Sequence, residues 1–188
     1  MRYIEKISNN IWKIKADSNV YFLDFKEKII IDSGRRSNRA ILEQFLKPII
    51  EFDKITKVFF THLHYDHIGN FDLFQNANFF ASAQSIKDFK ENPMNEILDK
   101  EMIQKFKVEL EPLKDMFGLK IIETPGHTRG SLCIWYEKEK ILFSGDTIFG
   151  KNRVGRTDLP TSSPEDLPKS LAKLVDYPFK ILCSGHDY

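Results

Sequence analysis

The chain has 188 residues, of which 41% are hydrophobic and 29% charged, and its formal net charge is +1. These values are typical of one globular domain that buries a core without disulfides, so we expect a single domain over residues 1–188. They argue against a nucleic-acid or membrane partner, because no basic surface and no membrane-spanning apolar run is evident, and the N-terminus has no signal-peptide segment, so we expect a cytoplasmic location.

The first part of the chain alternates apolar segments with turn residues. Apolar, β-branched and aromatic residues between these turns predict strands at residues 3–7, 11–15, 20–25 and 28–31. Asp32 directly follows the fourth strand, where a carboxylate can orient a metal ligand or cap a turn, and both interpretations stay open. Apolar residues at helical spacing then predict a helix over residues 38–50.

One short stretch carries most of the chemistry of the sequence. Directly after an apolar strand it places four potential metal ligands, namely His62, His64, Asp66 and His67. Side chains at i and i+2 of an extended segment point the same way, so His62 and His64 can share one metal. As the chain curls into a helix, Asp66 and His67 can face a second point nearby. Imidazole and carboxylate ligands without thiolate suit zinc, iron or manganese.

The rest of the chain repeats the pattern of a strand followed by a potential ligand. Further strands are expected at residues 58–60, 79–81, 119–122, 131–136, 140–143 and 179–183, with helices from Phe71, over 83–89 and over 164–175. Pro168 fits poorly inside the last helix, so a later start of that helix is the alternative. His127, Asp146 and His186 each follow a strand and a glycine. All five histidines of the chain follow predicted strands, three in the histidine-rich stretch and two after later strands. This placement argues against the interpretation that they are ordinary polar loop residues.

This order of residues resembles the metallo-β-lactamase-fold hydrolase superfamily, and the closer likeness is to its glyoxalase II-like branch, the hydroxyacylglutathione hydrolases. The segments that carry the closer likeness are Gly-His-Thr-Arg-Gly-Ser at 126–131, Gly-Asp-Thr-Ile-Phe at 145–149 and Gly-Arg-Thr-Asp-Leu-Pro at 155–160. The resemblance implies an α/β (α+β) fold, the αββα four-layer sandwich. Periodicity alone indicates only a mixed α and β domain.

The resemblance also implies a site for two divalent metal ions, with zinc expected and iron or manganese as alternatives. One ion would be held by His62, His64 and His127, the other by Asp66, His67 and His186, with Asp146 bridging them. A water bridging two such ions is acidified, so hydroxide forms near neutral pH and can attack an acyl carbonyl. Asp66 is in addition the candidate catalytic residue that orients this nucleophile or passes a proton.

Four further features are interpreted through the resemblance. Asp32 stands where the family commonly has an aspartate that supports the metal site. Arg156 stands where glyoxalase II-type enzymes often place a basic residue near the substrate, although an ion pair with Asp158 explains it equally well. Tyr65 either borders the substrate pocket or packs. Residues 91–107, with apolar residues at helical spacing, correspond to a variable stretch that often overhangs the active site, so a lid, a homodimer contact and an ordinary packed helix are alternatives.

We therefore expect a metal-dependent hydrolase that cleaves a thioester or related acyl bond of a small-molecule substrate. The main alternative is a persulfide dioxygenase with one iron held by His62, His127 and Asp146; a lactamase, a lactonase and an RNA-processing nuclease are less favoured. Asp146 matches the bridging aspartate of the thioesterase branch rather than the cysteine or serine of zinc β-lactamases. Glyoxalase II has a helical C-terminal extension that helps bind glutathione, and nothing follows Tyr188, so we expect little discrimination for glutathione thioesters.

Overall fold

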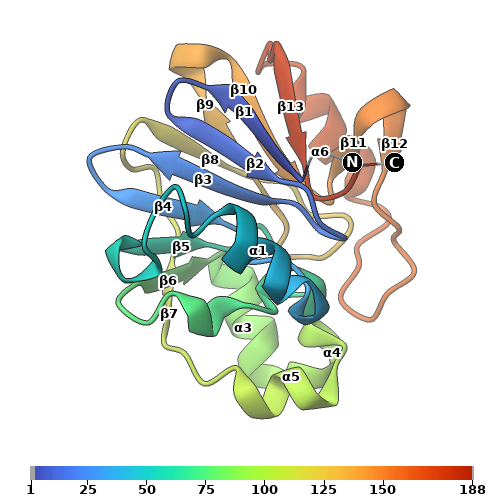
Figure 1. Ribbon diagram of the computed structural model, residues 1–188. Coiled ribbons are helices and arrows are strands. Elements are labelled where there is room, and N and C mark those ends of the chain that lie inside the picture. The colour runs from blue at the N-terminus through green and yellow to red at the C-terminus, as the bar shows by residue number, and fades with distance from the viewer. Residues whose placement is uncertain (1–2, 188) are drawn as a thin grey trace.

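The computed structural model describes residues 3–187, and over this part of the chain two β-sheets face each other with helices on both outer sides (Figure 1). This architecture is the αββα sandwich, so the predicted fold class is confirmed. Residues 1, 2 and 188, which include the first and last residues of the predicted domain, lie outside the described part. Within residues 3–187, no helix is long and apolar enough to cross a membrane.

The larger sheet of the described chain has seven strands, hydrogen-bonded to one another in sequence order. They are β1 (Ile4–Ser8), β2 (Ile11–Ile14), β3 (Val20–Asp24), β4 (Lys28–Ile31), β5 (Lys57–Phe59), β6 (Asn78–Ala81) and β7 (Leu110–Pro112). The first four pair antiparallel, as the turn residues between them predict. From β4 to β7 the neighbours are parallel, so the chain crosses over between them. These crossovers contain α1 (Arg39–Phe45), α2 (Tyr65–Ile68), α3 (Ala83–Glu91), α4 (Pro93–Ile97) and α5 (Lys100–Lys105).

The smaller sheet has the strand order β13-β10-β9-β8. Its strands are β8 (Leu119–Glu123), β9 (Leu132–Tyr136), β10 (Ile141–Gly145) and β13 (Ile181–Ser184). β10 and β13 are parallel, and α6 (Leu167–Leu174) lies in the connection between them. A short ribbon of β11 (Ile148–Phe149) and β12 (Arg153–Val154) precedes this helix.

Three apolar clusters hold the four layers together. Alternate residues along a strand point to opposite faces of its sheet, so one strand contributes to two clusters. On β3, Tyr21 and Leu23 lie between the two sheets, whereas Phe22 faces the helices outside the larger sheet. On β9, Ile134 lies between the sheets and Trp135 packs in the cluster that includes α6. The sheets are therefore fixed relative to each other, and with them the loops at their edges.

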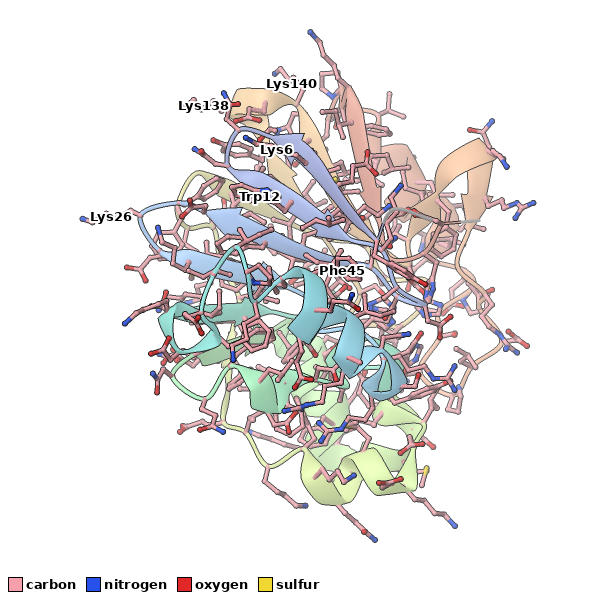
Figure 2. All side chains as sticks on the ribbon, viewed as in Figure 1. Lys6, Trp12, Lys26, Phe45, Lys138 and Lys140 are labelled. Atoms are coloured by element: carbon pink, nitrogen blue, oxygen red, sulfur yellow. The ribbon has the colours of Figure 1, made fainter. Side chains whose placement is uncertain are left out.

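Charged turns occupy the end of the sandwich where β4 and β10 begin. Lys26 lies in the turn before β4, and Lys138 lies in the turn before β10. Both side chains point away from the protein in Figure 2. The opposite ends of these two strands lead to Asp32 and Asp146, so the residues with predicted chemistry lie at the other end of the sandwich.

Several predicted helix boundaries are wrong. The helix predicted over 38–50 ends at Phe45, because Pro48 disfavours helical conformation in the residue before it. The helix predicted over 164–175 begins only at Leu167, since Pro168 lacks an N–H group and fits only the first turn. The helix predicted from Phe71 is a single 3₁₀ turn, Phe71–Leu73. The preceding α-helix, α2, lies within the histidine-rich stretch itself.

Residues 91–107 form two short helices rather than one. The break lies at Leu98, whose backbone adopts the left-handed conformation with φ 66°. Ile97, Met102 and Phe106 are buried against the larger sheet, so the packed-helix interpretation accounts for most of the segment. Strands β7, β11 and β12 were not predicted from the sequence, because each is only two or three residues long.

Candidate metal centre

All seven residues predicted to hold metal lie together beyond the ends of strands at one edge of the sandwich. β5 leads to His62 and His64, α2 carries Asp66 and His67, β8 leads to His127, β10 to Asp146 and β13 to His186. These segments come from both sheets, so the site exists only when the two sheets are packed face to face.

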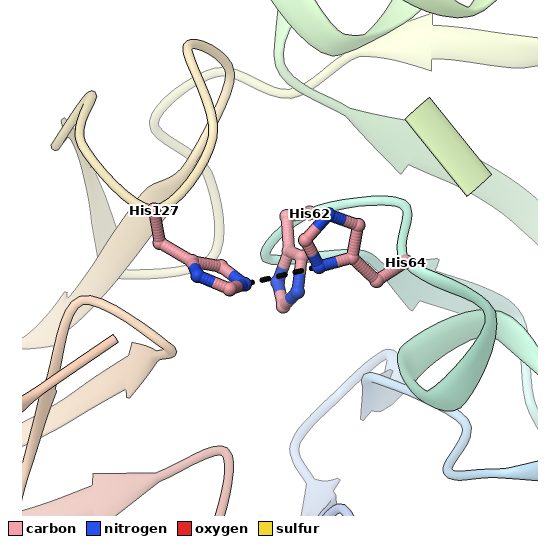
Figure 3. Close-up of side chains that lie close together, drawn as sticks. All are labelled: His62, His64 and His127. Atoms are coloured by element: carbon pink, nitrogen blue, oxygen red, sulfur yellow. Dashed lines mark hydrogen bonds between the residues drawn. The ribbon is translucent and has the colours of Figure 1, made fainter. Parts of the chain in front are cut away.

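The first group of ligands is His62, His64 and His127, whose potential ligand atoms lie within 4.8 Å of one another. Figure 3 shows the three rings converging, with Nε2 of His127 at 3.0 Å from Nδ1 of His64. Two ligand atoms of a tetrahedral zinc ion with bonds of 2.0–2.1 Å are separated by about 3.3 Å. The arrangement of these rings therefore fits one divalent ion.

The second group is Asp66, His67 and His186, and Asp146 lies between the two groups. Nε2 of His186 is 3.4 Å from Oδ2 of Asp66 and 3.4 Å from Oδ2 of Asp146. The other oxygen of Asp146, Oδ1, lies 3.4 Å from Nε2 of His67. Asp146 also reaches the first group, since its Oδ2 is 3.6 Å from Nε2 of His127. One carboxylate therefore contacts both groups.

Unsatisfied polar atoms show what the cluster is suited to bind. Nε2 of His62, Nε2 of His67 and Oδ1 of Asp146 are buried and make no hydrogen bond of good geometry within residues 3–187. A buried polar atom without a partner costs about 1–3 kcal/mol, so a cluster of such atoms indicates a bound group. Imidazole nitrogens and carboxylate oxygens that converge are the donor set of a zinc or iron site. The residues fit two divalent cations.

Asp32 fixes the orientation of His67. Its Oδ2 accepts a hydrogen bond from Nδ1 of His67 at 2.9 Å, which leaves Nε2 of the ring to face the cluster. The same carboxylate accepts hydrogen bonds from the backbone N–H and the hydroxyl of Thr61, both at 2.8 Å. Asp32 therefore contacts a potential metal ligand and also accepts from a backbone N–H in the adjacent turn, so it makes the contacts of both interpretations.

Two backbone carbonyls play the same role for other rings. Nδ1 of His127 donates to the carbonyl of Arg156 at 2.8 Å, and Nδ1 of His186 donates to the carbonyl of Asp17. In both rings Nε2 is left to face the cluster. Neither contact could be predicted from the sequence, because a carbonyl acceptor leaves no signature in residue type.

Electrostatics divide the site into a neutral and an acidic half. Burial lowers the pKa of His64 to about 3, and burial with the neighbouring His67 and His64 holds the pKa of His62 well below its ordinary value. Neutral imidazole is the form that binds metal. Burial disfavours ionisation of Asp66, but His67 and His186 outweigh it and lower its pKa to about 2. Burial disfavours the charged form of His67 and His186 in this half, but Asp146 outweighs it and raises the pKa of His67 above its ordinary value and that of His186 to about 9. A cation that binds there would replace the protons of these rings.

A cleft of about 570 Å³ opens onto the site. Tyr65 and Arg156, both predicted to contact substrate, line it. The Arg156 side chain is exposed and pairs with Asp158 through two contacts of 2.7 Å, which is the alternative that the sequence left open. The guanidinium of Arg35 lies 5.3 Å from the centre of the Tyr65 ring.

Two glycines allow the close approach of chain segments at the site. A Cβ atom at Gly185 would lie 2.1 Å from Oδ1 of Asp146, and one at Gly155 would lie 2.0 Å from the carbonyl oxygen of Asp146. Any side chain at either position would displace Asp146 or the loop beside it. The sequence shows these glycines only as neighbours of predicted site residues, and the close contacts that require them depend on the fold.

The chain matches a known protein family over nearly its whole length. The profile of the metallo-beta-lactamase superfamily matches residues 15–186. The chain belongs to this superfamily. A probable metallo-hydrolase of Methanocaldococcus jannaschii is 35% identical over 173 residues, which cover 82% of this chain and 78% of that protein.

Two further relatives of the superfamily carry more specific names. An atrochrysone carboxyl ACP thioesterase of Aspergillus fumigatus is 30% identical over 174 residues, covering 90% of this chain and 50% of that protein. A hydroxyacylglutathione hydrolase of Bartonella quintana is 32% identical over 136 residues, covering 70% of this chain and 48% of that protein. The chain thus spans about half of the length of these two relatives.

Solved structures of the superfamily share the fold. A metallo-beta-lactamase from Pontibacter korlensis superposes with a TM-score of 0.77 at 18% identity, covering 98% of this chain and 91% of that chain. A protein solved in a di-iron-bound form superposes with a TM-score of 0.71 at 22% identity, covering 91% of this chain and 88% of that chain.

Proposed function

We propose that this chain is a binuclear metal-dependent hydrolase that cleaves a thioester or related acyl bond of a small-molecule substrate in the cytoplasm. One observation carries the binuclear part: Asp146 contacts both groups of ligands, at 3.6 Å from His127 and 3.4 Å from His186. A shared carboxylate relieves the repulsion between two cations a few ångströms apart. An enzyme with a single iron has no use for the second group, Asp66, His67 and His186.

The relatives support the choice of reaction. One is named a hydroxyacylglutathione hydrolase and another an ACP thioesterase, and both names denote thioester cleavage. Zinc is the metal that we propose, since three imidazoles suit it, and iron is the alternative that the di-iron neighbour supports.

The metal ions and Asp66 would have different roles in the reaction. Two divalent ions in the site would supply an acidified water and a positive charge that polarises the acyl carbonyl. Asp66 is ionised and lines the cleft, so with the ions bound it would accept a hydrogen bond from the attacking water and return that proton to the leaving thiolate. The products are a carboxylic acid and a thiol.

Residues around the cleft hold the rest of the substrate. Tyr65 follows His64 directly and its ring lines the cleft, where it can lie against the substrate. The backbone carbonyl of Arg156 accepts a hydrogen bond from His127, which places this residue beside the site. Its guanidinium is paired with Asp158, so a substrate could bind it only by weakening or breaking that ion pair. We therefore propose a supporting role for both side chains.

The experiment is a metal analysis of protein purified without added metal, followed by a screen of thioester, lactone, β-lactam and phosphodiester substrates. Metal-dependent hydrolysis that is fastest for thioesters supports the proposal. One iron per chain together with oxygen uptake on persulfide substrates would replace it with the dioxygenase alternative.

A further inference from the structure

The corner between α4 and α5 places a strained apolar residue at the site. Leu98 has φ 66° and ψ 15°, a left-handed conformation that leucine rarely adopts. Strained backbone of this kind persists where the surrounding structure determines it, and it gathers at ligand-binding sites. Leu98 lines the cleft above the candidate metal centre.

The corner is held rigidly from both sides. The N–H of Leu98 donates to the carbonyl of Met94 at 3.0 Å, which closes α4. The side chain of Asp99 accepts from the N–H of Met102 at 2.7 Å, which opens α5. Ile97 and Met102 are buried in the outer core, so the helices on both sides of Leu98 are anchored. The leucine side chain is thereby presented at a fixed position.

Besides Tyr65, four aliphatic or aromatic side chains of the described chain line the same cleft, and Leu98 is one of them. The others are Phe149 on β11, Val154 on β12 and Leu159 in the following loop. Val154 is 43% exposed and Leu98 and Leu159 are half-buried, so part of their apolar surface faces the cleft. Binding an apolar group there would remove that surface from water.

Outside the candidate metal centre, the charged side chains of the cleft are already paired. Among the cleft residues that the structure describes, Arg156 is the only arginine or lysine, and it forms a bidentate pair with Asp158. The carboxylate of Asp17 pairs with Arg35 at 3.0 Å. An anionic substrate would have to compete for Arg156, whereas an uncharged one would not.

We propose that Leu98 is a specificity-determining residue, and that with Phe149, Val154 and Leu159 it binds an uncharged aliphatic group attached to the thioester. This inference rests on the proposed thioester hydrolysis. The aliphatic group can lie on the acyl or on the thiol side of the bond that is cleaved, and two substrate series distinguish these arrangements.

The first series holds the thiol constant as N-acetylcysteamine and varies the acyl group from acetyl to butyryl and hexanoyl. The second holds the acyl group as acetyl and lengthens an uncharged alkyl thiol. The inference predicts that kcat/KM of the metal-loaded wild type rises with chain length in one series. Leu98→Ala should lower kcat/KM about tenfold for the longest member of that series and by less than about threefold for the acetyl compound.

Two other variants keep this test decisive. Leu98→Gly also removes the side chain but accepts the left-handed backbone without strain, so it should show the same loss of selectivity even if Leu98→Ala folds poorly. Met94→Ala is the matched control, because Met94 lies on the same helix, is 36% exposed and does not line the cleft. An unchanged chain-length preference in folded Leu98→Gly would overturn the inference and leave the proposed function intact.

A binding measurement separates failure of the inference from failure of the proposed function. Calorimetry on metal-loaded protein compares acetate with hexanoate, and octane-1-thiol with ethanethiol. If the wild type cleaves no thioester, the proposed function falls, and the affinities still test the subsite. A preference for the longer ligand that Leu98→Gly removes supports the subsite, and equal affinities in wild type and variant refute it.

Discussion

Oδ2 of Asp32 lies 2.9 Å from Nδ1 of His67, and both side chains are buried. The contact joins the end of β4 to the helix α2, two segments that are far apart in the sequence. It fixes the proton of the His67 ring on Nδ1 and leaves Nε2 to face Asp146. The geometry of the second group of potential ligands therefore depends on a residue outside that group.

Replacing Asp32 with asparagine should weaken metal binding without unfolding the protein. Asparagine tolerates the left-handed conformation of this position, φ 55°, but its amide cannot accept all three hydrogen bonds made by the carboxylate. We expect the affinity for the more weakly bound ion to fall about 10–100-fold, measured by competition with a chelator. Asp53→Asn is the control, since Asp53 is exposed; equal affinities in the two variants would argue against this role.

Glycine at position 185 should be required for the site. The Cβ of Gly185→Ala would lie 2.1 Å from Oδ1 of Asp146 and 2.8 Å from Cε1 of His67, so these side chains must move. We expect at least one metal ion to be lost from the purified variant, measured by elemental analysis. Gly150→Ala provides the comparison, because its Cβ would meet nothing within 4 Å. The account is contradicted if both variants retain the metal content of the wild type.

Asp146 and Arg156 should differ strongly in their effect on activity. Asp146→Ala removes the carboxylate that contacts both groups of ligands, so metal content and kcat should both fall, the latter by several orders of magnitude. Arg156→Ala removes an exposed guanidinium that is paired with Asp158, and we expect a loss of about tenfold or less in kcat/KM. Similar losses in the two variants with unchanged metal content would disprove this ranking.

The metal site was easier to predict from the sequence than its surroundings. The spacing of His62, His64, Asp66 and His67 follows from local geometry, and the positions after later strands predicted that the remaining residues lie at the same edge. The parts that could not be predicted depend on contacts between distant segments. The carbonyl of Asp17 at His186 and the close approach that requires Gly185 are examples, since neither has a local pattern.

Short elements illustrate the same limit. The break at Leu98 has no glycine or proline to mark it, and it exists because Ile97 and Met102 are both buried in the outer core. The helix predicted near the histidine-rich stretch begins at Phe71, whereas α2 begins at Tyr65, within the stretch itself. Tertiary contacts, rather than propensity, decide both cases.

A buried carboxyl group outside the metal site should make stability depend on pH. Glu96 is fully buried beside the hydroxyls of Ser85 and Thr161, and burial raises its pKa from 4.5 to about 7. The folded protein therefore holds this proton over a range in which the unfolded chain has lost it. Its contribution to stability is complete below about pH 4.5 and is lost as the pH rises through about 7, by on the order of 3 kcal/mol.

The variant Glu96→Gln isolates this effect. Its side chain is neutral at every pH, so its free energy of unfolding relative to wild type should increase between pH 5 and pH 8. Urea denaturation at the two pH values measures the change, with the exposed Glu91→Gln as the control. If the difference between Glu96→Gln and wild type is the same at both pH values, Glu96 does not titrate in this range.

The most direct test of the account is the number of metal ions bound per chain. Protein saturated with zinc and freed of excess metal by gel filtration is analysed for zinc and for thioesterase activity, as wild type and as His186→Ala. The binuclear mechanism predicts two ions per chain and activity for the wild type, and one ion with little activity for the variant, whose three-histidine group is intact. A wild type that binds one ion at saturation and is fully active, or a variant with the zinc content and activity of wild type, would contradict the binuclear mechanism.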